Sequence, residues 1–173
     1  MDLGTEFLKS RVKEAVTQHR AFLTALEEHE EDAEDPRFRD LCSRHIPHMR
    51  DDDRMLEEYE SQLEGDAAAD QKGIRGAVGI SRELADTARG SDYNRLARDI
   101  GMAQQLEDTF KTFREAGKML GNRTLNEIGE IGERHHDAYG SEANRLIQHM
   151  FVERAQGLDG VTRKRADALD ARR

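Results

Sequence analysis

The stretch TEFLKSRVKEAVTQHRAFLTALEEHEE, residues 5–31, decides the fold. Its apolar positions recur at alternating intervals of four and three residues, which is the spacing of one face of a helix packed in a bundle. The seam positions are Leu8, Val12, Ala15, His19, Phe22 and Leu26. A long helix that buries a single stripe needs partners of similar length, so this stretch predicts a bundle of long helices.

Three further long helices follow from start and stop signals. Asp35-Pro36 is a favourable helix start, because Asp caps the first turn and Pro fits the first helical position. The second helix is therefore predicted from there to Gly65, with Leu41, His45, His48, Asp52, Met55 and Tyr59 on its seam. Gly121 is a turn signal between helices predicted over residues 92–120 and 123–156.

Residues 66–89 carry a weaker apolar stripe diluted by glycines, and we predict a crossover helix there. Residues 1–156 are then a single domain. Its predicted fold is an all-α antiparallel four-helix bundle of two hairpins joined by the crossover helix. Residues 157–173 are predicted to form a basic C-terminal tail, and no alternating pattern typical of a strand occurs.

Composition excludes several classes of partner. Charged residues make up 36% and the formal net charge is −9, so DNA and anionic membranes are repelled on average. No nucleic-acid partner is therefore expected. No membrane partner is expected either, since no apolar run approaches the ~20 residues of a membrane helix. The single cysteine, Cys42, excludes an intrachain disulfide and fits a reducing compartment. The first residues lack the pattern of a signal peptide, so a cytoplasmic location is expected.

Polar residues stand in the seams where a bundle normally places leucine. Seven fall at or beside the stripes of four predicted helices: His19, His45, His48, Asp52, Glu107, Glu133 and His136. Burying such groups without partners costs several kcal/mol each. They must therefore be satisfied by one another, by water or by a metal ion.

These polar residues also agree in height along the bundle. If the first two helices turn near residue 34, His19 precedes the turn by 15 residues and His48 follows it by 14. If the last two helices turn near residue 121, Glu107 precedes the turn by 14 residues and His136 follows it by 15. At a rise of about 1.5 Å per residue, both hairpins place these groups near mid-length.

This arrangement resembles the ferritin-like di-metal carboxylate bundles. Those proteins place one Glu on each of two helices and Glu-x-x-His on the other two. Residues 133–136, Glu-Arg-His-His, match the last Glu-x-x-His, and Glu107 matches the single Glu of the preceding helix. The second helix departs from the pattern, because residues 45–48, His-Ile-Pro-His, place His45 where Glu is expected, with Asp52 one turn further on. The first helix departs too, since it offers His19 rather than Glu. The resemblance covers about 120 residues across four helices.

The resemblance implies one or two transition-metal ions, with iron first, at mid-bundle. It implies a role in metal oxidation, metal storage or protection against oxidative stress, with a di-iron oxidase or ferroxidase-like activity as one option. Surplus apolar residues on the last helix, including Ile131, Ile147 and Phe151, need a second buried surface, either the crossover helix or a partner subunit, and we expect a homo-oligomer, a dimer or larger. A haemerythrin-like site and a bis-histidine haem rank lower. The rival interpretation is a metal-free helical-bundle interaction or adaptor protein, in which the polar seam gives pairing specificity.

Overall fold

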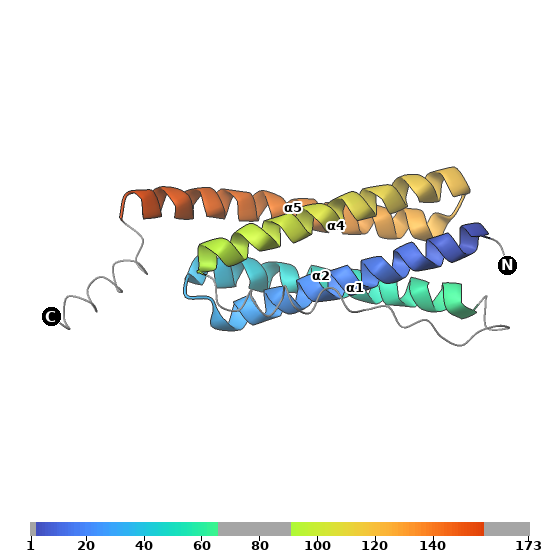
Figure 1. Ribbon diagram of the computed structural model, residues 1–173, viewed down its shortest axis with the longest axis horizontal. Helices are drawn as coiled ribbons and strands as arrows, with labels where there is room; N and C mark the ends of the chain where they lie inside the picture. Colours follow the sequence, from blue (N-terminus) through green and yellow to red (C-terminus); the bar gives the residue numbers. More distant parts are fainter. Residues whose placement is uncertain (1–2, 66–90, 158–173) are drawn as a thin grey trace.

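The computed structural model describes residues 3–65 and 91–157, which form four helices (Figure 1). They are α1 (Leu3–Asp32), α2 (Pro36–Gly65), α4 (Asp92–Leu120) and α5 (Arg123–Ala155). The prediction of an all-helical bundle of four long helices is confirmed, and these described ranges contain no strand. The crossover helix predicted over 66–89 lies outside the described residues, as does the predicted basic tail apart from Gly157.

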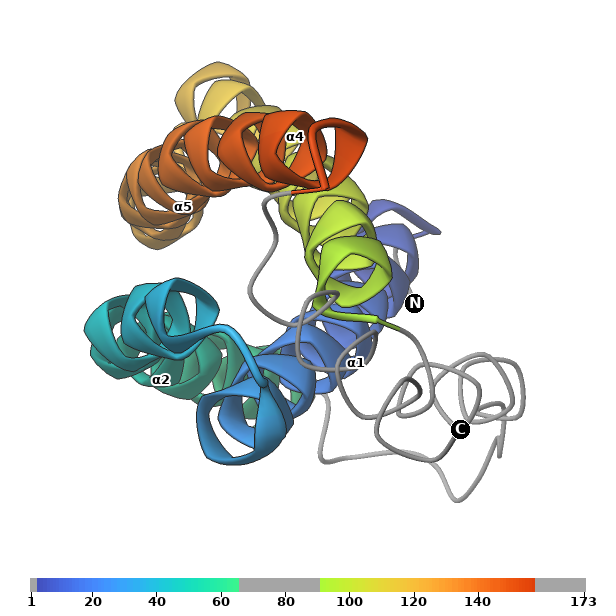
Figure 2. The same cartoon turned by 90° about the vertical axis from the view of Figure 1, so that its left-hand side faces the viewer.

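The helices form two sequence-adjacent pairs, α1 with α2 and α4 with α5. The pairs meet along two further seams, because α1 also packs on α4 and α2 packs on α5. The end-on view in Figure 2 shows the four helices around one shared interior. The chain reverses direction in each short turn, and α2 ends at the end of the bundle opposite to the start of α4 (Figure 1).

The α1–α2 turn has the predicted capping residue. The Oδ1 atom of Asp35 accepts a hydrogen bond from the backbone N–H of Arg37 at 2.8 Å, directly after Pro36 opens α2. This bond satisfies one of the N–H groups that a helix start leaves without an intrahelical partner. The turn is also tied to α4, because Asp92 Oδ2 accepts from the backbone N–H of Asp35 at 2.6 Å.

The α4–α5 turn depends on the predicted Gly121. It has a left-handed conformation with φ 65°, which only glycine adopts at little cost. Asn122 N–H donates to the carbonyl of Gly117 at 2.9 Å, and the Asn122 side chain accepts from Leu125 N–H at 3.0 Å. The same side chain donates to the Tyr59 hydroxyl at 2.7 Å. One asparagine therefore ends α4, starts α5 and connects their turn to α2.

The seam of α2 differs from the predicted one in register. Met49 and Leu56 are buried, whereas His48 is exposed and Met55 is only partly buried. From His45 onward the buried positions are spaced by four and then three residues, as in a regular bundle helix. The predicted seam placed the interval of three residues first, and therefore chose His48 and Met55. The helix continues through Pro47.

The helices α4 and α5 approach each other more closely than ordinary side chains permit. A Cβ atom added at Gly117 would meet the backbone of Asn126, and one added at Gly129 would meet the backbone of Arg114. At Gly132 it would meet the ring of Phe110. The glycines at 117 and 129 therefore allow the two backbones to come together, and the missing side chain of Gly132 leaves space that the Phe110 ring fills.

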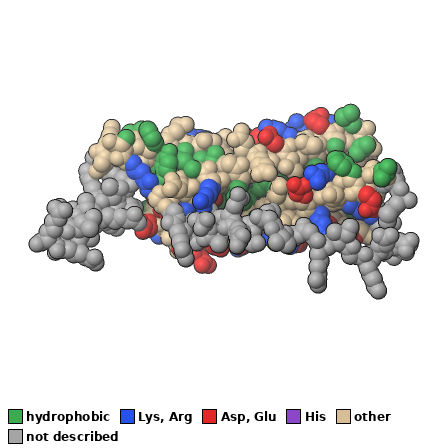
Figure 3. All heavy atoms as spheres, in the orientation of Figure 1, with side chains coloured by type: hydrophobic (Ala, Val, Ile, Leu, Met, Phe, Trp, Pro, Cys, Tyr) green, Lys and Arg blue, Asp and Glu red, His purple; other side chains and the backbone are tan. Residues whose placement is uncertain are grey.

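The exterior mixes charges of both signs, with apolar side chains toward both ends of the visible face (Figure 3). The exposed large apolar residues are Leu3, Phe7, Met119, Leu120, Phe151 and Val152. None of the described helices has a stretch long and apolar enough to cross a membrane.

Candidate metal centre

Three of the seven predicted polar residues meet in the middle of the bundle. His19 comes from α1, Asp52 from α2 and His136 from α5, and each has 0% exposed surface. One potential ligand atom from each lies within 4.8 Å of the other two. This group, called the His19–Asp52–His136 cluster below, could hold a metal ion.

His136 is held in one tautomer by its own helix. Its Nδ1 donates to the carbonyl of Gly132 at 2.8 Å, so Nε2 carries the lone pair, and Nε2 has no hydrogen-bond partner among the described residues. Burial, with a further effect of the nearby His19, lowers the pKa of His136 to about 3. A neutral imidazole with one nitrogen fixed by a carbonyl is the form in which histidine binds metals.

Asp52 is a buried carboxylate with one oxygen in use. Its Oδ1 accepts a hydrogen bond from Nδ1 of His135 at 2.8 Å. Its Oδ2 lies 3.8 Å from Nδ1 of His136 and has no hydrogen-bond partner within the described part of the chain. A carboxylate charge removed from water needs compensation by a cation or by several hydrogen bonds. Asp52 therefore leaves an acceptor directed at the two imidazoles.

His19 completes the cluster from α1, the helix paired with the α2 helix of Asp52. Its ring centroid lies 5.3 Å from that of His136 and 6.1 Å from that of Phe110. Its Nδ1 lies 3.5 Å from Asp53 Oδ1 without hydrogen-bond geometry. Neither ring nitrogen of His19 has a hydrogen-bond partner in the ranges 3–65 and 91–157. Buried polar atoms of native proteins nearly always have hydrogen-bond partners, so a group of several buried polar atoms without partners at one point is unusual.

Two imidazoles and one carboxylate are a known metal-ligand set. With open positions, this set is typical of non-haem iron(II), and catalytic zinc sites use a related one. Metal–ligand bonds of about 2.1 Å place neighbouring ligand atoms about 3.0 to 3.4 Å apart. The ligand atoms of the cluster lie within 4.8 Å of one another, so side-chain adjustments would bring them to these distances around an ion.

The two predicted glutamates lie outside the cluster and are paired with cations. Glu107 forms an ion pair with Lys111, one turn further along α4. Glu133 forms an ion pair with Arg114 across the α4–α5 seam. Both carboxylates are partly exposed, at 19% and 18%.

The two remaining predicted histidines flank the cluster on α2. His45 is buried, its Nε2 lies 3.4 Å from Glu142 Oε1, and its ring meets that of Tyr139 edge-on. Burial lowers the pKa of His45. His48 is exposed and stacks on His135, with ring centroids 4.7 Å apart and an interplanar angle of 28°.

A second buried polar group lies nearer the α1–α2 turn, and the sequence reasoning missed it. Asp99 Oδ2 accepts hydrogen bonds from His29 Nδ1 at 2.9 Å and from the Tyr139 hydroxyl at 3.3 Å. Burial raises the pKa of Asp99. The regular heptad spacing carries the signal, because His29 follows Leu26 by three residues and Asp99 follows Leu96 by three.

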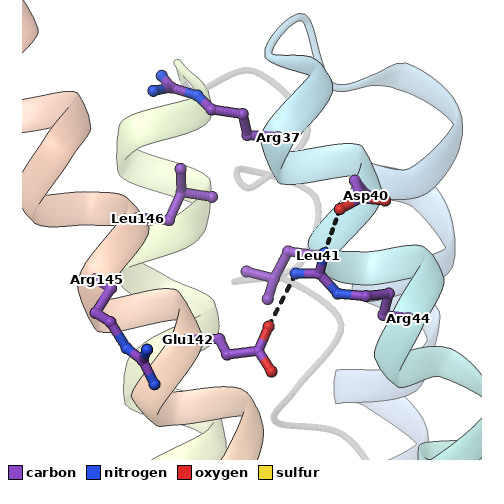
Figure 4. Close-up of a pocket in the computed structure, with 7 residues that line it drawn as sticks. All are labelled: Arg37, Asp40, Leu41, Arg44, Glu142, Arg145 and Leu146. Carbon is purple, nitrogen blue, oxygen red and sulfur yellow. Dashed lines mark hydrogen bonds and ion pairs between the residues drawn. The ribbon is translucent and has the colours of Figure 1, made fainter.

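A groove of about 330 Å³ runs between α2 and α5 beside His45. Arg37, Asp40, Leu41, Arg44, Glu142, Arg145 and Leu146 line it (Figure 4). Arg44 pairs across it with Glu142 and along α2 with Asp40. Its charges are thus largely paired, and the groove marks the α2–α5 seam as less tightly closed than the α4–α5 seam.

Comparisons with protein-family models, with curated proteins and with solved structures find no match for this chain. The ferritin-like resemblance therefore depends on the residues and their spacing. Function has to be argued from the geometry of the clusters.

Proposed function

We propose that the chain binds one divalent transition-metal ion at the His19–Asp52–His136 cluster, with iron(II) the best-matched ion. The observation that carries this proposal is the convergence of three buried ligand side chains that have partnerless atoms. An ion there would coordinate the imidazoles and compensate the buried carboxylate charge. In this proposal His135 and the Gly132 carbonyl orient the ligands by the hydrogen bonds they already make.

One ion fits the ligands better than two. A di-metal carboxylate centre needs glutamates that bridge or cap both ions. Glu107 and Glu133 are paired with Lys111 and Arg114 instead. Recruiting them would break both ion pairs, so the proposal is a mononuclear site.

The proposed chemistry follows from the small number of protein ligands. Three ligands leave coordination positions open, at which iron(II) would supply redox chemistry with oxygen or peroxide. The chain's own residues would bind and orient the ion, while Phe22 and Phe110, which lie against His136, keep bulk water out. Metal oxidation, metal storage or protection against oxidative stress would all use such a site.

The finer description of the fold is part of the same proposal. We propose an antiparallel bundle of two hairpins with one long connection, as in ferritin-like proteins. It is supported by the two short reversals and by the placement of the end of α2 and the start of α4 at opposite ends (Figure 1). The exposed Phe151 and Val152 on α5 support a homo-oligomer, which sedimentation would test. A cytoplasmic location stays a prediction from the single cysteine.

Metal content and thermal stability test the site directly. The purified chain is expected to hold close to one iron(II) or cobalt(II) ion, and a hundredfold excess of ion over Kd should stabilise the fold by about 2.7 kcal/mol. His19→Ala combined with His136→Ala should abolish both effects. The matched control is His149→Ala, which removes an exposed histidine from α5.

The rival function is a metal-free interaction protein whose polar core specifies the packing of its helices. The Asp99 network favours it, because there a buried carboxylate is held by hydrogen bonds from His29 and Tyr139. Wild-type protein that neither retains nor responds to iron, cobalt or zinc would overturn the metal proposal in favour of this rival.

A further inference from the structure

The His19–Asp52–His136 cluster is fully enclosed, so an ion can reach it only past the side chains that surround it. Of the four helix seams of the bundle, three carry charged or imidazole side chains beside this cluster: α1–α2, α4–α5 and α2–α5. They differ in the charge and chemistry of the residues along them.

The α1–α2 side carries a fixed cation. Asp53 lies 3.5 Å from His19 and is 15% exposed. The Arg20 guanidinium stands outside it, 3.9 Å from the Asp53 carboxylate, and also pairs with Glu57. This guanidinium is thus paired with two carboxylates, and a guanidinium has no lone pair to offer to a divalent cation.

The α4–α5 side is closed by packing and by two further cations. The ring of Phe110 fills the space beside Gly132 and lies 5.0 Å from the His136 ring. Outside it, Lys111 and Arg114 pair with Glu107 and Glu133. The close backbone approach at Gly129 leaves these helices little freedom to separate.

The α2–α5 side carries a column of metal-binding side chains from core to surface. Asp52 has no exposed surface, its partner His135 is 16% exposed, and His48 is exposed and stacks on His135. Imidazole is the commonest protein ligand of transition metals. The groove beside His45 lies on the same seam but is lined by Arg37, Arg44 and Arg145, so the column of His48 and His135, and not the groove, distinguishes this side.

We propose that His48 and His135 form the entry site through which a hydrated divalent transition-metal ion reaches the buried cluster. This inference rests on the proposed function. The ion first binds the exposed His48 and its neighbour His135. His135 then releases Asp52, and the ion passes inward to the ligands.

A group that touches the ion only on the way in has a distinctive kinetic effect. It changes the rates of binding and release by the same factor, so the equilibrium Kd stays constant. A ligand of the final site instead changes Kd. Cobalt(II) is a suitable probe, because its visible absorption follows ligation in stopped-flow mixing and in equilibrium titration.

The expected result is that His48→Ala slows cobalt uptake and release by about tenfold at constant Kd. His48→Phe, which keeps a ring over His135 but removes the nitrogens, should be equally slow. His149→Ala, the exposed histidine control, should load at the wild-type rate.

Each other result overturns a different statement. If the wild-type protein takes up cobalt and His48→Ala binds and releases it at the same rates, the entry site is rejected and the buried centre is retained. A weaker Kd with an unchanged binding rate would make His48 a ligand of the final site, which also rejects the inference. Wild-type protein that takes up no cobalt at equilibrium would reject the proposed function itself.

Discussion

Two aspartates of the described helices have no exposed surface, Asp52 and Asp99, and each keeps one carboxylate oxygen without a hydrogen-bond partner among the described residues. They differ in what surrounds the other oxygen. Asp99 Oδ2 accepts hydrogen bonds from His29 and Tyr139. Burial raises the pKa of Asp99, and these two hydrogen bonds and the Arg95 charge only partly oppose that rise. Asp52 receives one hydrogen bond, from His135.

The difference lies in the number of imidazoles per carboxylate. At Asp99 a single histidine, His29, is hydrogen-bonded through Nδ1 to Oδ2, the oxygen that also accepts from Tyr139. Around Asp52 stand His19, His135 and His136, and three of their nitrogens have no hydrogen-bond partner among the described residues. Several ring nitrogens without hydrogen-bond partners around one carboxylate can serve as ligands of a metal ion. A single histidine hydrogen-bonded to a single carboxylate instead forms a network that needs no ion.

The largest expected effect separates the two carboxylates in metal-free protein. Asp99→Ala should destabilise the fold by about 3 to 5 kcal/mol, because it leaves the buried His29 and Tyr139 without their shared acceptor. Asp52→Ala should cost less, since it also removes a poorly compensated buried charge. Urea unfolding of both variants in the presence of a chelator measures the difference. Equal losses would mean that the two sites are equally closed.

The second prediction concerns pH. The folded pKa of His136 is about 3 and the unfolded value is about 6.5, so the unfolded chain binds more protons between these values. Stability of the metal-free protein should therefore fall as pH drops from about 6.5 toward 3, by an amount on the order of a few kcal/mol.

Urea midpoints measured along a pH series test this dependence. His136→Gln should flatten the fall, because it removes the titrating imidazole while keeping a polar side chain. An unchanged slope in that variant would assign the acid sensitivity to other groups.

The smallest effects are expected at the glutamates outside the cluster. Glu107→Gln and Glu133→Gln each break a partly exposed ion pair, to Lys111 and to Arg114, which should leave the urea midpoint nearly unchanged because solvent screens such pairs. Neither change should alter cobalt affinity by more than about twofold. A large loss of affinity in either variant would bring the glutamates back as ligands and reopen the two-metal site.

Heptad spacing predicts most of the fold and part of the candidate site. The seam steps place His19 and His136 inward, and they place Asp52 on the same face of its helix. His29 and Asp99 also fall at the next seam positions, three residues after Leu26 and Leu96, so the same spacing predicts that they are buried.

Residues at the edge of a stripe are harder to place from the sequence. A rotation of α2 about its own axis decides whether His48 or Met49 faces the core. That rotation is set by packing against the other helices. Glu107 has Lys111 four residues further on, a pairing that stabilises a solvent-facing position. The partner of Glu133, Arg114, lies on another helix, so local spacing cannot identify it.

The ligands of the proposed centre come from both helix pairs, with His19 and Asp52 on the α1–α2 pair and His136 on the α4–α5 pair. A bound ion would therefore cross-link two halves that are otherwise joined only by non-covalent contacts: side-chain packing, hydrogen bonds and ion pairs. The only cysteine, Cys42, has no second thiol in the sequence with which to form an intrachain bridge. In this chain a coordinated ion would take the place of a disulfide, as a cross-link that forms and dissolves with the supply of metal.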